Sequence, residues 1–286
     1  MIERIEIPVA DAVLSARVAG PEQGLPMVLL HGIPANSGLW CGVMPILAQA
    51  GWRVWAPDLP GYGQSRISAD ADHSLGGAAA LVSTWLGQMV DVGGRPPWLV
   101  GHDLGGGVAQ IVAARTPHLI SGLTLGDTVA EDSWPVLPVK LFRWVAWAGL
   151  YPALCALGLM PNFYARRALA KGMSRPVKPE EASEVFWGPK VSAPVGRRAF
   201  ARHLKALDPR QTVEAAPALK SLKVPTGLLW ADGDHYQPWL TVGRRLESLL
   251  PQTCESIIIP GGHFLPLDNP RGYAEALLTL THQARV

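Results

Sequence analysis

Short apolar runs of strand length recur along the first 125 residues and return near the carboxyl end of the chain. Most of these runs are continuous or alternate with polar residues, and Gly, Pro or Asp follows them closely. Runs of this length and pattern predict buried β-strands that end in tight turns. The expected strands are residues 5–9, 13–18, 27–30, 53–56, 98–100, 123–125, 226–231 and 256–259.

Helical patterns fall between some of these runs, at residues 77–89 and 105–115, and a last helical pattern closes the chain at 272–281. Strands that alternate with helices predict a mostly parallel central sheet with helices on both faces. The expected fold class is therefore α/β.

The alternation stops at residue 128 and resumes only after residue 217. The interval holds helical patterns and four tryptophans but no convincing strand. We therefore expect one core, formed by residues 1–127 and 218–286, with a helical cap of residues 128–217 inserted into it.

One part of the expected cap, residues 144–165, carries no charged side chain. Gly149, Pro152, Gly158 and Pro161 divide it into pieces well below the roughly 20 residues that a membrane span needs. We therefore expect buried amphipathic helices that line an apolar cavity, and no membrane span.

Composition narrows the classes of partner. Lys and Arg number 25 against 23 Asp and Glu, and no basic run exceeds two residues, so nucleic acid is not an expected partner. Cys41, Cys155 and Cys254 lack metal-ligand spacing and predict reduced, buried thiols. The amino-terminal residues lack the apolar segment of a signal peptide, and we expect a cytoplasmic protein.

A sharp turn is predicted between the strand at 98–100 and the helix at 105–115. Its sequence is Gly101-His102-Asp103-Leu104-Gly105, with a glycine two positions before and two positions after Asp103. Such a turn strains the backbone of its central residue and leaves little room beside it, which is why small residues are needed at both flanks. The pattern matches a nucleophile elbow in which Asp103 stands where serine is usual.

Two further loops fit the same chemistry. Leu30-His31-Gly32-Ile33-Pro34 follows a strand, and the backbone N–H groups of Ile33 and Leu104 are candidates to stabilise an oxyanion. Pro260-Gly261-Gly262-His263 follows the last strand, where the glycine pair lets the imidazole of His263 reach a distant nucleophile.

A histidine base needs a carboxylate that holds its tautomer and offsets its charge. Asp234 follows the penultimate strand, and Asp127 follows the strand after the elbow. We favour Asp234 as the acid and keep Asp127 as the alternative.

In the order His-Gly-x-Pro, nucleophile, helical cap, acid and base, the chain resembles the α/β-hydrolase family. It is most similar to the aspartate-nucleophile branch, which contains haloalkane and haloacetate dehalogenases and epoxide hydrolases. The resemblance covers nearly the whole chain and includes a turn typical of the family, Asp58-Leu59-Pro60-Gly61-Tyr62-Gly63-Gln64-Ser65.

The resemblance implies the α/β-hydrolase fold and a covalent mechanism. Asp103 would attack an sp³ carbon to form an ester, and water activated by His263, which Asp234 would hold, would hydrolyse that ester. Ile33 and Leu104 would be the oxyanion donors. The implied partners are a small hydrophobic substrate and water, with no metal and no cofactor.

The leaving group stays open at this point. Haloalkane dehalogenases usually place Trp after the nucleophile and many place Asn after His-Gly, where this chain has Leu104 and Ile33. Epoxide hydrolases use two cap tyrosines to protonate the opening oxygen. The candidate donors in the expected cap are Trp134, Trp144, Trp147, Tyr151, Tyr164, Trp187 and His203.

Asp127 matches the acid position of some dehalogenases. On that ground we expect hydrolytic cleavage of a carbon–halogen bond in a small organohalogen. Epoxide hydrolysis is the first alternative, and ligand binding on a hydrolase scaffold without turnover is the second.

Overall fold

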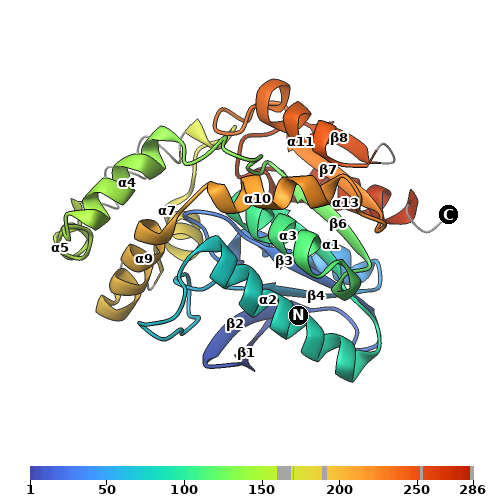
Figure 1. Cartoon of the computed structure of the whole chain (residues 1–286), viewed down its shortest axis with the longest axis horizontal. Coiled ribbons are helices and arrows are strands. Elements are labelled where there is room, and N and C mark those ends of the chain that lie inside the picture. Colours follow the sequence, from blue (N-terminus) through green and yellow to red (C-terminus); the bar gives the residue numbers. More distant parts are fainter. Residues whose placement is uncertain (160–168, 170, 189–191, 252–253, 284–286) are drawn as a thin grey trace.

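The central sheet has eight strands in the order β1-β2-β4-β3-β5-β6-β7-β8 (Figure 1). The computed structural model describes residues 1–159, 169, 171–188, 192–251 and 254–283. Strand β2 pairs antiparallel with both neighbours, and every pair from β4 to β8 is parallel. The strands are β1 (Glu3–Val9), β2 (Ala12–Ala19), β3 (Leu25–Leu30), β4 (Trp52–Pro57), β5 (Trp98–His102), β6 (Gly122–Gly126), β7 (Thr226–Ala231) and β8 (Glu255–Ile259).

Helices cover both faces of this sheet, which confirms the expected α/β class (Figure 1). The helices are α1 (Met44–Gln49), α2 (Leu75–Gly93), α3 (Leu104–Arg115), α4 (Leu137–Trp147), α5 (Tyr151–Ala156), α7 (Pro179–Glu181), α9 (Pro194–Ala206), α10 (Arg210–Leu219), α11 (Arg244–Leu249), α12 (Leu265–Asp268) and α13 (Pro270–Gln283). Shorter 3₁₀ or π-helical segments are η1 (Ser37–Trp40), η2 (Pro117–Leu119), η4 (Ala182–Trp187) and η5 (Trp239–Gly243).

The core consists of two apolar layers, one on each face of the sheet. Successive side chains of a strand point to opposite faces, so a strand buried on both faces is apolar throughout. In β3, Val28 and Leu30 pack in the layer that includes α2, α3 and α10, whereas Met27 and Leu29 pack in the layer with α1 and α13.

Parallel pairing brings the carboxyl ends of six strands, β3 to β8, to one edge of the sheet. Strand β5 lies between β3 and β6, and β7 and β8 continue the same parallel array. In open α/β sheets, ligands bind in the crevice outside these ends. The loops that follow β3, β5, β6, β7 and β8 carry the residues expected to act in catalysis.

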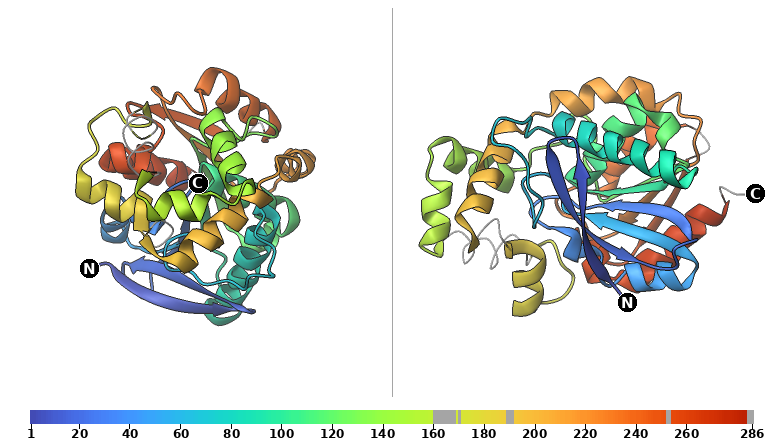
Figure 2. Two further views of the ribbon diagram at one scale, coloured as in Figure 1. Left: turned by 90° about the vertical axis from the view of Figure 1, so that its left-hand side faces the viewer. Right: turned by 90° about the horizontal axis from the view of Figure 1, so that it is seen from below.

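Helices α4, α5 and α9, which we call the lid helices, pack against one another and project beyond one end of the sheet (Figures 1 and 2). Trp144 is 70% exposed and Trp147 is 58% exposed, so the expectation that this stretch is buried is wrong for its outer face. Helix α10 packs against α3 although most of it lies within residues 128–217. The division into a core and a cap at residues 127/128 and 217/218 stays a prediction.

Among the described residues, no helix combines the length and apolar character that crossing a membrane requires.

The three cysteines differ in burial. Cys155 is buried as expected, but Cys41 and Cys254, which lie outside the helices and strands, are partly exposed.

The buried carboxylate of Asp58 ties three segments together at the edge of the sheet. Its Oδ1 accepts the backbone N–H of Ser37 at 2.8 Å, and its Oδ2 accepts the backbone N–H of Gln64 at 2.8 Å and the guanidinium of Arg4 at 3.0 Å. In the same turn, the N–H of Leu59 donates to His31 Nε2 at 2.9 Å. The turn at residues 58–65 therefore anchors the loop that carries Ile33.

We expect Asp58→Ala to lower the free energy of unfolding by about 3 kcal/mol, because it leaves the N–H donors of Ser37 and Gln64 without an acceptor and the part-buried guanidinium of Arg4 without its anionic partner. Urea denaturation followed by circular dichroism measures this loss. The matched control is Glu6→Ala, which removes an exposed ion pair with Arg66 and should leave the midpoint of the urea transition unchanged. Equal shifts for the two variants would contradict the anchoring role of Asp58.

Candidate active site

Asp103 occupies a strained position between β5 and α3. Its backbone has φ 50° and ψ −123°, a conformation that non-glycine residues rarely adopt. A Cβ on Gly105 would overlap the carbonyl oxygens of Leu30 and His31, so the elbow needs glycine there to pack against β3. The hydroxyl of Thr128 donates to the carbonyl oxygen of Asp103 at 2.6 Å and helps to hold the turn.

The carboxylate of Asp103 accepts hydrogen bonds from the two backbone groups that the sequence predicts as oxyanion donors. The N–H of Ile33 donates to Asp103 Oδ2 at 2.8 Å, and the N–H of Leu104 also bonds the carboxylate. Burial raises the pKa of Asp103 to about 6, although the charge of His263 and these two N–H groups act in the opposite direction.

His263 reaches the elbow from the loop after β8. Its Nδ1 lies 2.9 Å from Asp234 Oδ2, so Nδ1 carries the proton and Nε2 faces Asp103 Oδ1 at 3.9 Å. His102 supports this placement, because its Nε2 bonds the carbonyl oxygen of His263 at 2.7 Å. Burial alone would lower the pKa of His263, but the charges of Asp234 and Asp103 raise it above its ordinary value.

Asp234, and not Asp127, contacts the imidazole. Asp234 Oδ1 accepts the N–H groups of Tyr236 at 2.7 Å and Gln237 at 3.0 Å, which leaves Oδ2 for His263. Burial of Asp234 opposes ionisation, but His263 and these N–H groups keep its pKa below the usual value.

Asp127 is completely buried beside Asp234. Its Oδ1 accepts the N–H of Ala231 at 2.8 Å. Burial and the neighbouring charge of Asp234 raise the pKa of Asp127 well above its ordinary value. Burial and the charge of Asp234 therefore favour the protonated form of Asp127, whose Oδ2 is buried without a hydrogen-bond partner in the described part of the chain.

Three of the four tryptophans expected to donate to a leaving group either face solvent or already donate their N–H to another residue. The indole N–H of Trp134 donates to Thr212 Oγ1 at 2.8 Å. Trp144 and Trp147 face solvent, with their ring centroids 6.4 Å apart. Tyr164 and the side chain of Trp187 lie outside the described residues.

Tyr151 and His203, in contrast, meet in one buried aromatic cluster. Tyr151 packs on Phe200 at 5.4 Å between ring centroids, and His203 packs on Tyr62 at 5.0 Å. Tyr62 in turn lies 5.2 Å from Phe200 and 5.0 Å from His31 of the Ile33 loop. The cluster thus joins the lid helices to the loop that contacts Asp103.

Burial shifts the pKa values of the two polar members of the cluster, Tyr151 and His203, in opposite directions. Burial raises the pKa of the Tyr151 hydroxyl, which also bonds the thiol of Cys155, so the phenol keeps its proton. Burial lowers the pKa of His203 to about 4, and its Nδ1 bonds the carbonyl oxygen of His73 at 2.9 Å. His203 Nε2 is buried and has no hydrogen-bond partner within the described part of the chain. Sequence reasoning did not single out Phe200 or Tyr62 as the residues that connect these two groups.

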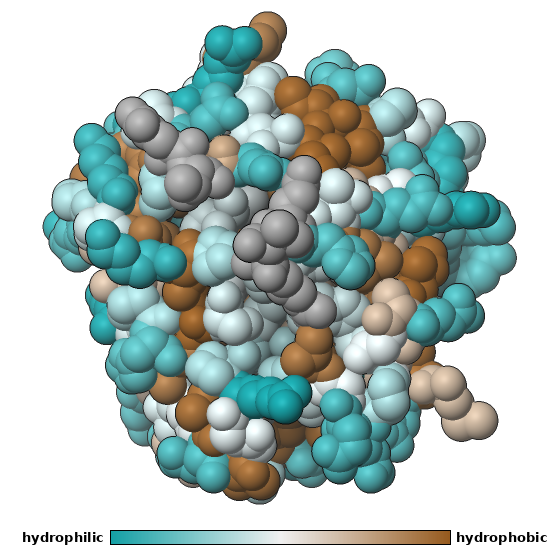
Figure 3. All heavy atoms as spheres, turned by 90° about the vertical axis from the view of Figure 1, so that its right-hand side faces the viewer, coloured by the Kyte–Doolittle hydropathy of each residue, from teal (hydrophilic) through white to brown (hydrophobic). Residues whose placement is uncertain are grey.

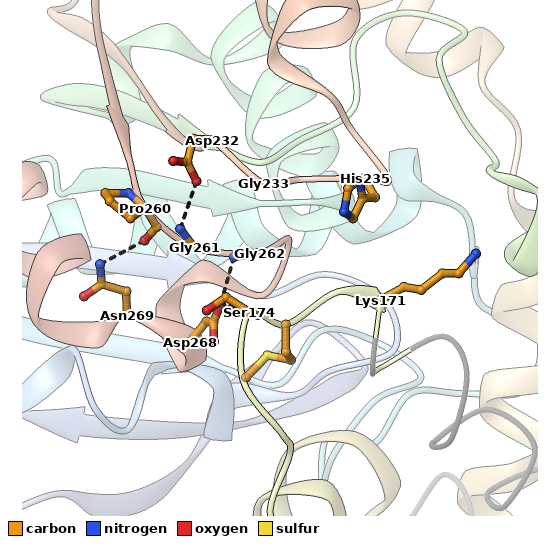
Figure 4. A pocket seen from close by; sticks show the side chains of 11 residues that line it. Lys171, Ser174, Asp232, Gly233, His235, Pro260, Gly261, Gly262, Asp268 and Asn269 are labelled. Atoms are coloured by element: carbon orange, nitrogen blue, oxygen red, sulfur yellow. Dashed lines mark hydrogen bonds between the residues drawn. The ribbon is translucent and has the colours of Figure 1, made fainter.

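A cavity of about 980 Å³ lies next to the loops that precede Asp234 and His263 (Figure 4). Gly233 and Gly262 line it, but the side chains of Asp234 and His263 do not. At its edge, Asp268 Oδ2 accepts the N–H of Gly262 at 2.7 Å and the N–H of Ser174 at 2.8 Å. The cavity is therefore a neighbour of the site and not the place where a substrate meets Asp103.

Within the described residues, no cluster of His, Cys, Asp and Glu is arranged to hold a metal ion. The geometry instead provides a carboxylate, two backbone donors, an imidazole and its carboxylate partner. Residues 26–270 match the alpha/beta hydrolase fold family.

The chain belongs to the α/β-hydrolase fold family. It is 31% identical over 256 residues to a pimeloyl-[acyl-carrier protein] methyl ester esterase of Methylococcus capsulatus, covering 81% of this chain and 93% of that protein.

Solved structures of similar fold include haloalkane dehalogenase DbeA from Bradyrhizobium elkani, with a TM-score of 0.80 and 22% identity. The match covers 100% of this chain and 99% of the dehalogenase. The epoxide hydrolase CorEH has a TM-score of 0.78 and 21% identity, with 99% of each chain covered. These comparisons identify this α/β hydrolase as a hydrolytic enzyme, and the structural likenesses concern the fold.

We expect Asp234→Asn to slow turnover by roughly 10³- to 10⁴-fold, because an amide favours the wrong tautomer of His263. Asp127→Asn should stay within about tenfold of the wild type, because its amide oxygen can still accept the N–H of Ala231 and Asp234 remains to hold His263. Steady-state rates of the two variants on one substrate measure the difference. A larger loss from Asp127→Asn would make Asp127 the acid of the triad.

Proposed function

We propose that this α/β hydrolase uses the carboxylate of Asp103 to attack an sp³ carbon and forms an ester that water then hydrolyses. The observation that carries the proposal is the unequal environment of the two carboxylate oxygens. Oδ2 accepts the N–H of Ile33 at 2.8 Å, whereas Oδ1 faces His263 Nε2 at 3.9 Å, a distance too long for a hydrogen bond. One oxygen is fixed by the backbone, and the other is left to act as the nucleophile.

A carboxylate suits attack on an alkyl carbon better than it suits ester cleavage. Attack on an sp³ carbon needs no general base and gives an ordinary ester. Attack on an acyl carbon would give an anhydride and would have to expel an alkoxide, so esterases of this fold carry serine at the elbow. Asp103 therefore argues against the methyl ester cleavage for which the Methylococcus relative is named.

The same groups serve the second step. In the ester, Oδ2 is the carbonyl oxygen. The N–H of Ile33 already faces it and the N–H of Leu104 contacts the same carboxylate, so they can stabilise the charge that develops when water adds to Cγ. His263 Nε2 takes the proton of that water and gives it to the departing oxygen. The Cγ–Oδ1 bond breaks, Oδ1 leaves in the product, and the oxygen of water completes the new carboxylate.

Ester formation also prepares His263 for its task. Before alkylation, the negative charge of Asp103 is one of the charges that raise the pKa of His263. The ester is neutral, so this contribution disappears once the covalent bond forms. The imidazole then becomes the neutral base that hydrolysis requires.

For the leaving group, the described cap residues favour an epoxide oxygen over a halide. An alkoxide needs a proton to depart, whereas a halide needs none. The buried hydroxyl of Tyr151 is protonated, and its thiol partner Cys155 is a weak acceptor that a developing alkoxide can displace. The indoles of Trp134, Trp144 and Trp147 offer no comparable donor to a halide. The proposed substrate is a small apolar epoxide, and the product is a diol.

We expect the rate of covalent ester formation to fall as the pH drops through about 6, because Asp103 must be ionised to attack and burial raises its pKa to about 6. Ester hydrolysis should also slow on acidification, because His263 must be neutral and its pKa is raised. Rapid-quench measurements of ester formation between pH 5 and 8 test the first statement. A rate that does not change over this range would contradict it.

In His263→Ala we expect the ester to accumulate on Asp103. Intact-protein and peptide mass spectrometry after incubation with a panel of epoxides and haloalkanes should find an adduct that adds the full mass of an epoxide. A haloalkane would add only its alkyl group. Adding Tyr151→Phe should slow adduct formation from epoxides at least about 100-fold and leave adduct formation from haloalkanes unchanged.

The controls separate the nucleophile from the leaving group. Adducts from haloalkanes alone, with halide released and no diol, would replace the epoxide assignment by dehalogenation and leave the role of Asp103 in place. Turnover that survives Asp103→Ala, or adducts found only on other residues, would overturn the nucleophile. Binding without any adduct or product would favour a ligand-binding protein.

A further inference from the structure

Helix α4 presents an apolar face to solvent at the outside of the lid. Leu137, Leu141 and Trp144 follow one another at spacings of four and three residues, so they line one side of the helix, and Lys140 and Trp147 lie beside them. We call these five residues the lid face. Leu137 is 69% exposed and Leu141 is 55% exposed, and Trp144 and Trp147 are also largely in solvent.

The exposure of the lid face is not the result of a poorly packed helix. The opposite side of α4 is buried through Val139 and Ala146, which belong to the large core layer. Helix α4 also packs against α9 and α5, so its orientation is fixed by its neighbours. Trp144 and Trp147 therefore point outward because the inner side of the helix is already occupied.

Exposed apolar side chains concentrate in this region. Of the thirteen large hydrophobic residues that are exposed in the described part of the chain, eight lie between residues 137 and 195. The face of the molecule on the far side from the lid helices shows apolar side chains only in patches interrupted by hydrophilic ones (Figure 3). Contiguous exposed apolar surface usually marks a site of interaction.

The charge of the lid helices is equally one-sided. Helices α4, α5 and α9 contain no acidic residue and six basic ones: Lys140, Arg143, Arg197, Arg198, Arg202 and Lys205. The whole chain has a net charge of only +2, so the lid helices are far more basic than the rest of the molecule. Arg143 lies over the ring of Trp147 at 5.3 Å, which places a cation directly beside the apolar surface.

We propose that the lid face binds the surface of a bilayer that contains anionic phospholipid. A helix with Trp and Leu on one face and Lys and Arg beside it lies in the plane of the lipid headgroups, where the indoles enter the interface and the cations meet the phosphates. Charge complementarity selects anionic lipid, since each basic residue near such a surface adds to the binding. The helix would lie on the membrane and would not cross it.

Co-sedimentation with vesicles tests the proposal. The full-length protein should sediment with vesicles of phosphatidylcholine and phosphatidylglycerol at low salt, and should sediment much less with pure phosphatidylcholine or at high salt. Trp144→Ser with Trp147→Ser should lower the partition coefficient at least about tenfold, because the apolar anchors are lost. Lys140→Glu with Arg198→Glu should lower it by a similar factor on anionic vesicles.

Matched controls come from η5 and α11, which lie outside the lid helices. Leu240→Ser removes a side chain that is 74% exposed on η5, and Arg244→Glu reverses an exposed charge at the start of α11. Neither should change vesicle binding. Thermal unfolding monitored by circular dichroism verifies that all variants fold. If the tryptophan variants do not fold, the charge variants still test the proposal.

Three outcomes would overturn the proposal. The first is no binding to anionic vesicles, and the second is equal loss of binding in the control and lid variants. The third is a dimer in sedimentation equilibrium, or a complex with a soluble acidic protein, that Trp144→Ser abolishes while vesicles fail to bind. In that case a second copy or a protein partner covers the lid face.

Discussion

The burial of one carboxylate constrains the rest of the site. Asp103 is buried at the end of β5, and the two backbone N–H groups that contact its carboxylate offset much of the cost of burying it. One of these groups belongs to the loop after β3, which packs so closely on the elbow that residues 32 and 105 must be glycine. The order of strands in the sheet, with β3 next to β5, therefore lets the folded protein bury the carboxylate of Asp103, the proposed nucleophile.

Most of the fold and the meeting of the candidate site residues could be predicted from the sequence, because both depend on local patterns. Apolar runs of three to six residues followed by turn formers locate the strands, and glycines at 101, 105, 261 and 262 mark where the backbone must turn sharply. The contact between Asp234 and His263 follows from the strand order, which carries both residues to one edge. These signals need no knowledge of how distant side chains pack.

The lid could not be predicted in the same way. Its helices are apolar on more than one side, so the sequence of residues 144–159 does not show which side faces the core. Trp144 and Trp147 turn outward because Val139 and Ala146 occupy the inner side of the helix. The indole N–H of Trp134 donates to Thr212. Tyr151 and His203 come together through Phe200 and Tyr62, a contact between segments that no short motif records.

The side chain of Asp268 limits how freely the lid of this molecule can be exchanged for another. Asp268 Oδ2 accepts hydrogen bonds from Gly262, next to His263, and from Ser174, which lies between the lid helices α5 and α9. A graft that replaces the lid by that of another relative would take away the backbone at residue 174, and with it one of the two hydrogen bonds that fix Asp268 beside the loop of His263. In evolution as in engineering, a new lid on this hydrolase has to reproduce that contact or accept a less well-placed histidine, so substrate range and catalytic alignment are inherited together.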